Sequence, residues 1–354
     1  MVKPSAPLSK SLRLLCGGTI AACLATAACL PDPQIQVPDF APAPVSDGGT
    51  VVRTDGPSGD LGTARWGAYG TVASAPLLRA GWVADPGLSE AYAVGHGGTI
   101  LHRTGDGDWQ VEKSGTDANL YAVAARSATE VFAVGDRGVI LRRVGSSWQQ
   151  EGSELHMTTA FFGVAMLTTG EVIAVGDLGT VARRQTAGAW VIETSDALIG
   201  TGLRAVWGTQ LEGLYAVGLG GVIVRRVQGK WERDTLAMDP SGRGNYYAIT
   251  GAGEDVHIAG EYGVVLHRSS DGTRWVVDKL PPLSGMVTAP HIFSLYLQGG
   301  ELLAAGAGGL IERLSAGSWT IEPTGTANDL YGLAGAGLRS VLTVGAHGTV
   351  LRRQ

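Results

Sequence analysis

The sequence predicts an all-β fold: a seven-bladed β-propeller of four-stranded antiparallel blades, closed by an N-terminal strand. Three observations support this prediction. A marker glycine at the end of an apolar run recurs at spacings of 40, 41, 42, 42, 46 and 39 residues, a period typical of blades, solenoid turns or arrays. Residues within each repeat alternate as in β-strands. A tryptophan follows the glycine at a nearly constant distance in all repeats but the last. The marker glycines are Gly95, Gly135, Gly176, Gly218, Gly260, Gly306 and Gly345.

One repeat, Leu120 to Trp148, shows how the strands are expected to follow one another. Asn119–Ala124, Glu130–Gly135 and Gly138–Arg143 are predicted strands, and a Gly-Ser-Ser turn leads into a fourth strand that begins at Trp148. We name these strands A, B, C and D in chain order. Four short strands at this period, with turn residues between them, favour a propeller blade.

Closure of the ring is predicted from the tryptophans. They are Trp109, Trp148, Trp190, Trp231, Trp275 and Trp319. The seventh repeat ends at Gln354 after its predicted strand C (Gly348–Arg353), which would leave an unpaired strand edge. Trp66 lies 43 residues before Trp109, and residues 61–354 number 294, or seven times 42. We therefore expect the segment around Trp66 to supply strand D of the last blade.

The repeat resembles two families of propeller proteins. Ser269–Trp275 (SSDGTRW) resembles the Asp-box (BNR) repeat of sialidases, and Gly97–Trp109 (GGTILHRTGDGDW) is similar to the repeat of photosystem II assembly factors. Most of the other units lack the Asp of the box. The resemblance implies a fold and a binding role, and it implies no particular activity.

The N-terminus predicts export. A positively charged stretch with Lys3, Lys10 and Arg13 precedes an apolar segment, Leu14–Ala25, and a small-residue cleavage site at Thr26-Ala27-Ala28. Because Cys29 follows that site, the segment resembles the signal peptide of a bacterial lipoprotein. That resemblance implies a lipidated (palmitate-carrying) Cys29 and an outer-membrane location, facing the periplasm or the cell surface.

Alternatives to this interpretation are a lipidated Cys23, an ordinary secreted protein and an uncleaved anchor. We divide the chain into a signal peptide (1–28), a tether rich in Pro and Asp (29–62) and the propeller (63–354). Gly48–Thr54 in the tether resembles a strand C, as a relic or as an extra edge strand. Without residues 1–28 the chain has 24 Lys and Arg against 32 Asp and Glu, a formal charge of −8 that argues against nucleic acid as a partner.

All three cysteines, Cys16, Cys23 and Cys29, precede the predicted propeller. The propeller can therefore hold no disulfide, thiolate nucleophile or cysteine metal site. We expect no cofactor and no metal, although His96 and His347 lie in adjacent B–C loops. We expect the acids of the B–C loops to stabilise the turns in which they lie. These acids are Asp136 and Asp177, in Gly-Asp-x-Gly loops, and Glu261. The tryptophans are expected to pack between blades.

One basic residue lies near the end of each predicted strand C, and we call these seven residues the basic column. It consists of His102, Arg142, Arg183, Arg225, His267, Arg313 and Arg352. An acid follows six of the tryptophans by three residues: Glu112, Glu151, Glu193, Asp234, Asp278 and Glu322. Since strands C and D form a hairpin, we expect salt bridges within each blade, in preference to a surface for anionic headgroups. Tyr69 takes the place of the acid in the borrowed strand.

The candidate partner site lies on two long D–A connections, where the repeat is most irregular. These connections are Met238–Tyr247 and Leu280–Phe293, and the candidate residues are Arg243, Tyr246, Tyr247, Pro281, Pro282, Met286 and His291. We expect a monomeric, membrane-anchored scaffold that binds an envelope protein or a glycan without catalysis, or an assembly factor for an envelope complex. The alternative function is an exported carbohydrate-active enzyme, with Glu254, Asp255, Arg243, Tyr246 and Tyr247 as its off-repeat cluster. A further alternative places the partner over the central axis.

Lipidation of Cys29 predicts where the protein fractionates. Several acyl chains, at about 0.8 kcal/mol per buried CH₂, make membrane attachment effectively permanent. Cys29→Ser should move the protein into the soluble fraction or leave it unprocessed, as measured by membrane fractionation and intact mass. Fully processed Cys29→Ser protein that still pellets with membranes would rule out this assignment.

Overall fold

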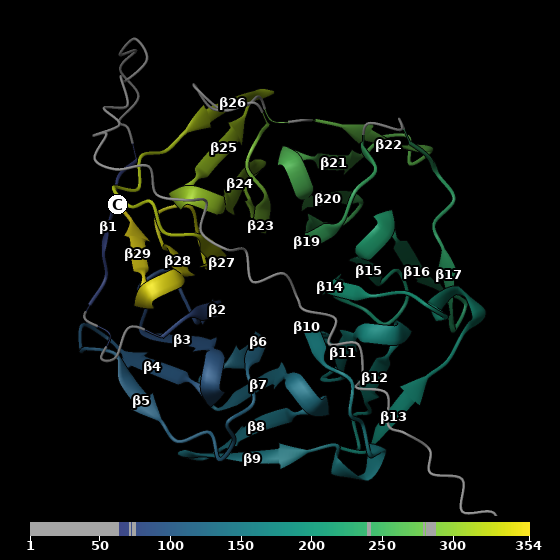
Figure 1. The fold of residues 1–354 in the computed structure, drawn as a ribbon, viewed down its shortest axis with the longest axis horizontal. Helices are drawn as coiled ribbons and strands as arrows, with labels where there is room; N and C mark the ends of the chain where they lie inside the picture. Colours follow the sequence, from purple (N-terminus) through teal and green to yellow (C-terminus); the bar gives the residue numbers. More distant parts are fainter. Residues whose placement is uncertain (1–63, 71, 73–75, 239–241, 279, 281–287) are drawn as a thin grey trace, which may run out of the picture. The chain divides into compact units, whose positions relative to one another are not determined.

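The computed structural model describes residues 64–70, 72, 76–238, 242–278, 280 and 288–354. They form seven blades of four antiparallel strands arranged around a central axis, one of which carries an additional edge strand (Figure 1). The seven-bladed propeller predicted from the repeat is confirmed. In every blade, strand A lies toward the axis and strand D at the periphery (Figure 1).

The strands follow the chain blade by blade. Blade 1 contains β2 (Leu78–Val83), β3 (Glu90–Gly95), β4 (Ile100–Thr104) and β5 (Gln110–Glu112), and blade 2 contains β6 (Leu120–Ser127), β7 (Glu130–Gly135), β8 (Ile140–Val144) and β9 (Ser147–Glu151). Blade 3 contains β10 (Phe161–Met166), β11 (Val172–Gly176), β12 (Val181–Arg184) and β13 (Trp190–Glu193), and blade 4 contains β14 (Leu203–Trp207), β15 (Tyr215–Gly218), β16 (Ile223–Val227) and β17 (Lys230–Arg233).

The remaining blades follow the same order. Blade 5 contains β19 (Tyr246–Ala252), β20 (Asp255–Gly260), β21 (Val265–Arg268) and β22 (Arg274–Val277), and blade 6 contains β23 (Ile292–Gln298), β24 (Glu301–Gly306), β25 (Ile311–Ser315) and β26 (Ser318–Ile321). Blade 7 contains β27 (Leu330–Gly335), β28 (Val341–Gly345), β29 (Val350–Arg353) and β1 (Trp66–Ala68).

Short 3-10 turns connect strands B and C. They are η1 (His96–Gly98), η2 (Asp136–Gly138), η4 (Asp177–Gly179), η6 (Leu219–Gly221), η8 (Glu261–Gly263), η9 (Ala307–Gly309) and η10 (Ala346–Gly348). Two further turns, η3 (Ser153–Leu155) and η5 (Asp196–Leu198), lie in D–A connections. Strand C therefore begins later than predicted: in blade 2 it starts at Ile140, because Gly138 belongs to the turn.

The marker glycine is required because two backbone segments meet there. At Gly135, a Cβ atom would lie 1.9 Å from the carbonyl oxygen of Asn119, the residue before strand A, and the other marker glycines show the same approach at 1.9–2.1 Å. The φ of Gly135 is −168°, which is ordinary extended backbone. Steric exclusion of Cβ, and not an unusual backbone angle, therefore explains the repeated glycine.

Ring closure by the N-terminal strand is also confirmed. β1 pairs antiparallel with β29, with Trp66 opposite Arg353 and Ala68 opposite Leu351. The Trp66 indole donates a hydrogen bond of 2.9 Å to Glu322 at the end of blade 6. The last blade thus joins the two ends of the propeller unit, which spans Leu61–Gln354.

One strand was not predicted. β18 (Ala237–Met238) pairs in parallel with β22 as a fifth strand of the blade 5 sheet. The sequence analysis placed Met238 at the start of a D–A loop. The structure instead uses the beginning of that connection to cover the outer edge of blade 5, which satisfies part of an otherwise unpaired strand.

The core lies between blades, and Glu312 is a charged residue buried within it. Glu312 occupies the strand C position that holds Leu101 in blade 1 and Leu141 in blade 2, and it is 2 % exposed. Burial raises the pKa of Glu312 from 4.5 to about 7. A carboxyl whose pKa is higher in the folded state costs stability as pH rises from the unfolded value toward the folded value.

The cost of burying Glu312 should therefore depend on pH. Glu312→Gln is expected to differ from the parent by less than about 1 kcal/mol at pH 5 and to be more stable at pH 8, by up to about 3 kcal/mol for a pKa raised by about 2.5. Urea unfolding at the two pH values measures this, with Glu232→Gln on the exposed side of β17 as the control. A Glu312→Gln advantage that is the same at both pH values would contradict the explanation.

The closure strand gives a second stability prediction. A chain that starts at residue 75 lacks β1 and exposes the edge of β29, so it should aggregate or lose much of its stability. Size-exclusion chromatography and thermal unfolding measure this, against a chain that starts at residue 61. A monomeric chain from residue 75 that is as heat-resistant as the longer one would show that β1 is dispensable.

Candidate functional site

The candidate site is a ring of side chains at the start of the seven A strands, which we call the axial ring. Each member follows the first, buried residue of its strand and is itself partly exposed. The A strands line the inner edge of the propeller (Figure 1), so this position of each strand lies near the axis. The axial ring consists of Arg79, Tyr121, Phe162, Arg204, Tyr247, Phe293 and Tyr331.

Members of the axial ring contact one another in a continuous series. The ring centroids of Tyr247 and Phe293 lie 6.1 Å apart, and those of Phe293 and Tyr331 lie 5.1 Å apart. The Arg79 guanidinium lies 4.5 Å from the centre of the Tyr331 ring and 5.9 Å from that of Tyr121. These contacts combine aromatic packing with cation–π attraction.

The series continues through blades 2, 3 and 4. The rings of Tyr121 and Phe162 lie 4.8 Å apart, and the Arg204 guanidinium lies 4.0 Å above the Phe162 ring. The contacts therefore run from Tyr247 around the axis to Arg204. Such a chain of packed rings and planar guanidinium groups restricts the rotamers of its members and presents a preorganised surface.

Polar groups of the B–C turns and D–A connections orient the axial ring. Arg204 forms an ion pair of 2.8 Å with Asp177. The Tyr247 hydroxyl donates to Glu261 at 3.1 Å, and the Tyr331 hydroxyl donates to Asp329 at 3.3 Å. Arg79 donates through Nε to Nε2 of His96 at 3.1 Å. The acids of these loops therefore fix binding side chains, in addition to their expected role in the turns.

Two tyrosines of the axial ring, Tyr121 and Tyr247, have raised pKa values and stay protonated at ordinary pH. Burial, with a smaller contribution from Asp136, raises the pKa of Tyr121 to about 12. Burial also raises the pKa of Tyr247, and Glu261 raises it further. Both hydroxyls are consequently available as hydrogen-bond donors, not as phenolates.

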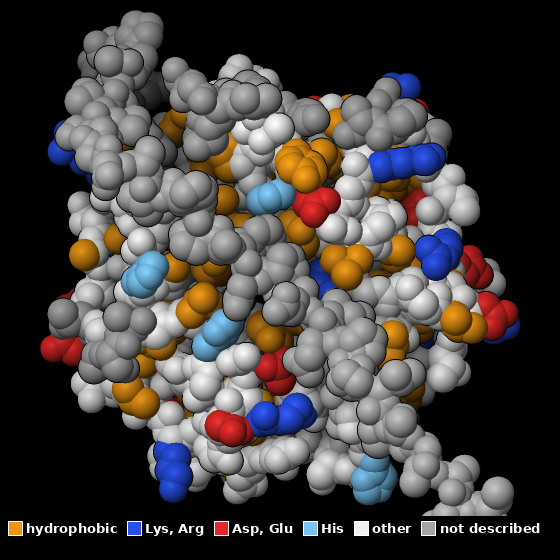
Figure 2. Space-filling model, in the orientation of Figure 1, with side chains coloured by type: hydrophobic (Ala, Val, Ile, Leu, Met, Phe, Trp, Pro, Cys, Tyr) orange, Lys and Arg blue, Asp and Glu red, His pale blue; other side chains and the backbone are white. Residues whose placement is uncertain are grey.

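Large exposed apolar side chains lie on the same side as the axial ring. Leu178 and Tyr262 in the B–C turns are 69 % and 51 % exposed, and Ile199 in a D–A connection is 71 % exposed. The space-filling view shows hydrophobic, histidine and a few acidic side chains gathered around the middle of the molecule, with Lys and Arg mostly toward its edge (Figure 2). An apolar, aromatic surface of this kind typically marks a binding face.

Two of the predicted partner residues join this surface. Tyr247 is a member of the axial ring. His291, which directly precedes β23, has its ring 5.1 Å from Tyr262 and 6.4 Å from Phe293. Nδ1 of His291 accepts a hydrogen bond of 3.3 Å from the backbone N–H of Tyr262. Tyr247 and His291 are therefore the two predicted residues that lie at the axial ring.

The other predicted residues are placed differently. Arg243 is exposed in the connection before β19. Tyr246 is fully buried, and its hydroxyl donates to the carbonyl oxygen of Gly242 at 2.9 Å, so its side chain holds the loop in place. Pro281, Pro282 and Met286 lie outside the described residues, as do Cys29 and Cys23. The partner surface that combines these residues stays a prediction.

The basic column forms the expected salt bridges in blades 1, 2, 3, 5 and 6. The pairs are His102–Glu112, Arg142–Glu151, Arg183–Glu193, His267–Asp278 and Arg313–Glu322. In most blades a second Arg directly follows the residue of the basic column. In the structure, Arg143 reaches Glu112 of the preceding blade at 3.0 Å, so the acid links two blades.

Each of four acids also accepts a hydrogen bond from the tryptophan of the next blade. The pairs are Trp148–Glu112 at 2.6 Å, Trp190–Glu151 at 3.0 Å, Trp231–Glu193 at 2.7 Å and Trp66–Glu322 at 2.9 Å. At the junction of blades 7 and 1, Tyr69 replaces the acid. There the Trp109 indole donates to the Tyr69 carbonyl oxygen at 2.8 Å, and the Arg103 guanidinium lies 3.5 Å from the centre of the Tyr69 ring.

The residues suggested for an enzyme do not assemble into one site. Tyr246 and Tyr247 begin β19, whereas Glu254 and Asp255 follow its other end, about 20 Å away for an extended strand of this length. Glu254 binds Arg268, and Asp255 lies 2.8 Å from His257. The glycosidase alternative therefore loses the cluster on which it rested.

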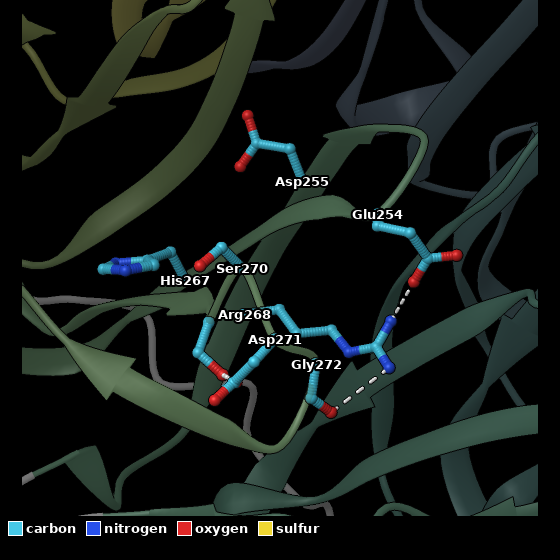
Figure 3. Close-up of a pocket in the computed structure, with 8 residues that line it drawn as sticks. Glu254, Asp255, His267, Arg268, Ser270, Asp271 and Gly272 are labelled. Atoms are coloured by element: carbon cyan, nitrogen blue, oxygen red, sulfur yellow. Dashed lines mark hydrogen bonds and ion pairs between the residues drawn. The ribbon is translucent and has the colours of Figure 1, made fainter.

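Glu254 and Asp255 line a pocket of about 520 Å³ with the Asp-box turn of blade 5 (Figure 3). Arg268 crosses this pocket toward Glu254 and Gly272 (Figure 3). Asp271 accepts hydrogen bonds from Ser269 and Thr273, which lower its pKa to about 2. The polar groups of the Asp-box turn thus bind one another, and the turn has a structural role.

Two further observations concern only the residues that the structure describes. Among them, no three His, Cys, Asp or Glu side chains lie close enough together to share a metal ion. No helix in the same residues is long and apolar enough to cross a membrane.

The axial ring was missed in the sequence analysis apart from Tyr247. Its signal is a large aromatic residue or Arg, 13 to 16 residues before each marker glycine and directly after a core residue, as in Leu120-Tyr121 and Phe161-Phe162. In an isolated strand this pattern is indistinguishable from ordinary alternation. Only alignment of the repeats by their glycines would have shown that the position is occupied in all blades.

Comparison with known proteins shows the fold. No protein-family model and no curated protein matches the sequence. Among solved structures, YCF48 from Cyanidioschyzon merolae is 18 % identical with a TM-score of 0.64, over 82 % of this chain and 99 % of that one. A structure of YCF48 bound to D1 peptide is 14 % identical with a TM-score of 0.66, over 84 % and 97 %. The WD40 repeats of RRP9 are 12 % identical with a TM-score of 0.65, over 82 % and 98 %. The chain is therefore similar in fold to YCF48 and to the WD40 repeats of RRP9.

Proposed function

We propose that this protein is an exported, lipid-anchored β-propeller that binds a segment of an envelope protein across its axial ring and has no catalytic role. The continuous series of aromatic and guanidinium contacts around the axis carries the proposal. Tyr and Arg are enriched among the residues that dominate binding energy in protein interfaces. Rings that are already packed against one another also lose little conformational freedom when a partner binds.

Two further observations support a protein as the partner. One similar structure is of a propeller, YCF48, bound to D1 peptide. The exposed Leu178, Ile199 and Tyr262 extend the apolar surface outward from the axis, enough to contact a segment longer than the ring itself. Glycan binding would also use the aromatic rings, and the nature of the captured partner distinguishes the two.

The signal-like N-terminus supports the location. Lipidation at Cys29 and the tether of residues 29–62 would attach the propeller to the outer membrane. A coil of about 34 residues spans on the order of 30 Å, which allows the binding face to reach a periplasmic or surface partner. The Cys29→Ser experiment tests this part of the proposal separately from the binding site.

The axial ring gives a binding prediction. Phe162→Ala combined with Phe293→Ala should reduce partner capture at least tenfold, because each ring removed from the centre of an interface typically costs 1 kcal/mol or more. The measurement is affinity capture with the full-length, anchored chain, followed by identification and titration of the captured protein. Protease treatment of the captured fraction shows whether the partner is a protein or a glycan.

Two comparison variants locate the site. Val111→Ala changes an apolar side chain on β5 that is 64 % exposed and distant from the axis, so it should leave capture unchanged. Shortening Pro281–Pro290 together with Arg243→Ala tests the predicted loop edge, and it should weaken capture with little change in Tm. If the Phe162 and Phe293 double variant captures its partner as well as the parent, the axial ring is not the site.

A further inference from the structure

The junction between blades 4 and 5 differs from its neighbours in one acid. At the preceding junction, the Glu193 carboxylate accepts from Nε of Arg183 at 2.7 Å, from Nε of Arg226 at 3.1 Å and from Nε1 of Trp231 at 2.7 Å. The equivalent donors one blade later are Arg225, Arg268 and Trp275. The equivalent acid is Asp234, which is one methylene shorter.

These three donor atoms are left without an acceptor in the structure. Nε of Arg225, Nε of Arg268 and Nε1 of Trp275 are buried and have no hydrogen-bond partner within the described part of the chain. They are the same three atoms that Glu193 satisfies at the previous junction. Trp275 is only 2 % exposed, so bulk water does not solvate its indole N–H. A buried donor without an acceptor costs about 1–3 kcal/mol.

The four groups of this junction lie against one another as they do elsewhere. Tyr215 and Trp275 pack edge to face with ring centroids 6.1 Å apart, and the Arg225 guanidinium lies 5.4 Å from the Tyr215 ring. Arg268 is the register partner of Trp275 on the neighbouring strand. The Tyr215 hydroxyl is a further buried donor without a partner among the residues described.

Asp234 cannot replace the longer acid. The backbone N–H of Asp234 donates a hydrogen bond to the carbonyl oxygen of Ile223 in strand C of its blade. The backbone N–H of Glu322 makes the same hydrogen bond to Ile311, so the two residues occupy equivalent positions. The Asp234 carboxylate instead accepts from the backbone N–H of Leu236 at 2.9 Å, at the entry to β18. The side chain is therefore both shorter and engaged elsewhere.

Arg225 also lacks the second acid that its counterpart has at the preceding junction. In blade 3 a second acid, Glu171, binds Arg183 at 2.7 Å, but its counterpart in blade 4 is Gly213. Arg225 accordingly has no ion pair with any residue that the structure describes. Single unpartnered nitrogens occur on Arg103, Arg142 and Arg313 as well, and each of these side chains has another hydrogen bond through a second nitrogen. Arg268 likewise donates through its other nitrogens to Glu254 and Gly272, so only its Nε is left for a ligand.

The next junction shows the alternative solution to a short acid. Asp278 takes the place of the Glu at that junction. Blade 6, however, has Leu314 where the other blades have the second Arg, so that guanidinium donor is absent there. His267 binds Asp278 directly. Only the junction of blades 4 and 5 combines a shortened acid with both arginines and the tryptophan.

We propose that the junction between blades 4 and 5 is a binding site for a small monovalent anion, a halide or a formate-sized carboxylate, held by Arg225, Arg268 and Trp275. The anion takes the position that the Glu carboxylate has at the other junctions. Two guanidinium N–H groups and one indole N–H match the acceptor geometry of one carboxylate. Since the donors lie between packed blades, larger anions are excluded by size.

Anion-dependent stability tests the site in the full-length chain. At constant ionic strength, replacing sodium gluconate with sodium chloride or sodium formate should raise the Tm of the parent. The rise should be about 2 °C at ten times the Kd, because a ligand that binds only the folded state stabilises it by mass action. The chloride and formate series together show whether a halide or a carboxylate is preferred.

Asp234→Glu is the decisive variant, since it supplies the missing carboxylate from the chain itself. It should be more stable than the parent in gluconate and should lose the response to chloride and formate. Asp278→Glu, at the junction without the second Arg, is the matched control and should keep the parent's response. A response that is equal in the parent and in Asp234→Glu, or absent in the parent, would overturn the proposal.

A direct measurement covers the case in which Asp234→Glu is poorly folded. Crystals of the parent grown in bromide should show an anomalous peak between Arg225 and Arg268, within hydrogen-bond distance of the Trp275 indole. Trp275→Phe removes one donor without adding a charge and should weaken both the peak and the Tm response. Bromide found only at other positions would contradict the site.

Discussion

A carboxylate buried between adjacent blades is the interaction on which this propeller most depends. Each strand C ends in one or two basic residues, and six of the seven D strands end near an acid, so one carboxylate can contact two blades at once. Glu193 shows the arrangement, with Arg183 from its own blade and Arg226 from the next. Because the tryptophan indole of the next blade donates to the same acid, its large apolar surface is buried without leaving a polar N–H unsatisfied.

The crowding of strands near the axis explains why large side chains collect in the axial ring. Seven A strands converge there, and the residue that faces the neighbouring strand must be small: a Cβ on Gly163 would lie 3.0 Å from Cα of Ala205. The preceding residue escapes this restriction because it lies at the end of the strand, beside the B–C turns. Large rings and guanidinium groups therefore collect at this one level, where Phe162 and Arg204 pack together.

Departures from the repeat occur where the interblade network changes. Tyr69 replaces the acid where the ring closes, and its carbonyl oxygen and aromatic face take over two of the contacts that a carboxylate would make. Asp278 is matched by the loss of an Arg in blade 6. Asp234 has no such compensation within the described residues, which is why its junction calls for an acceptor from outside the chain.

The sequence by itself determined the number of blades, the strand order, the closing strand around Trp66 and the pairing of basic and acidic columns. These features follow from local patterns, such as alternation and the position of glycine, that recur in every repeat. The tertiary structure alone decided the links between blades, the axial ring and the burial of Tyr246. Such features depend on which side chains from distant repeats contact one another. The two-residue period of a strand shows which face a side chain is on, but not which residue of another blade lies next to it. The short acid at Asp234 was visible in the sequence, but its consequence appeared only when the buried donors of Arg225, Arg268 and Trp275 were found without an acceptor among the described residues.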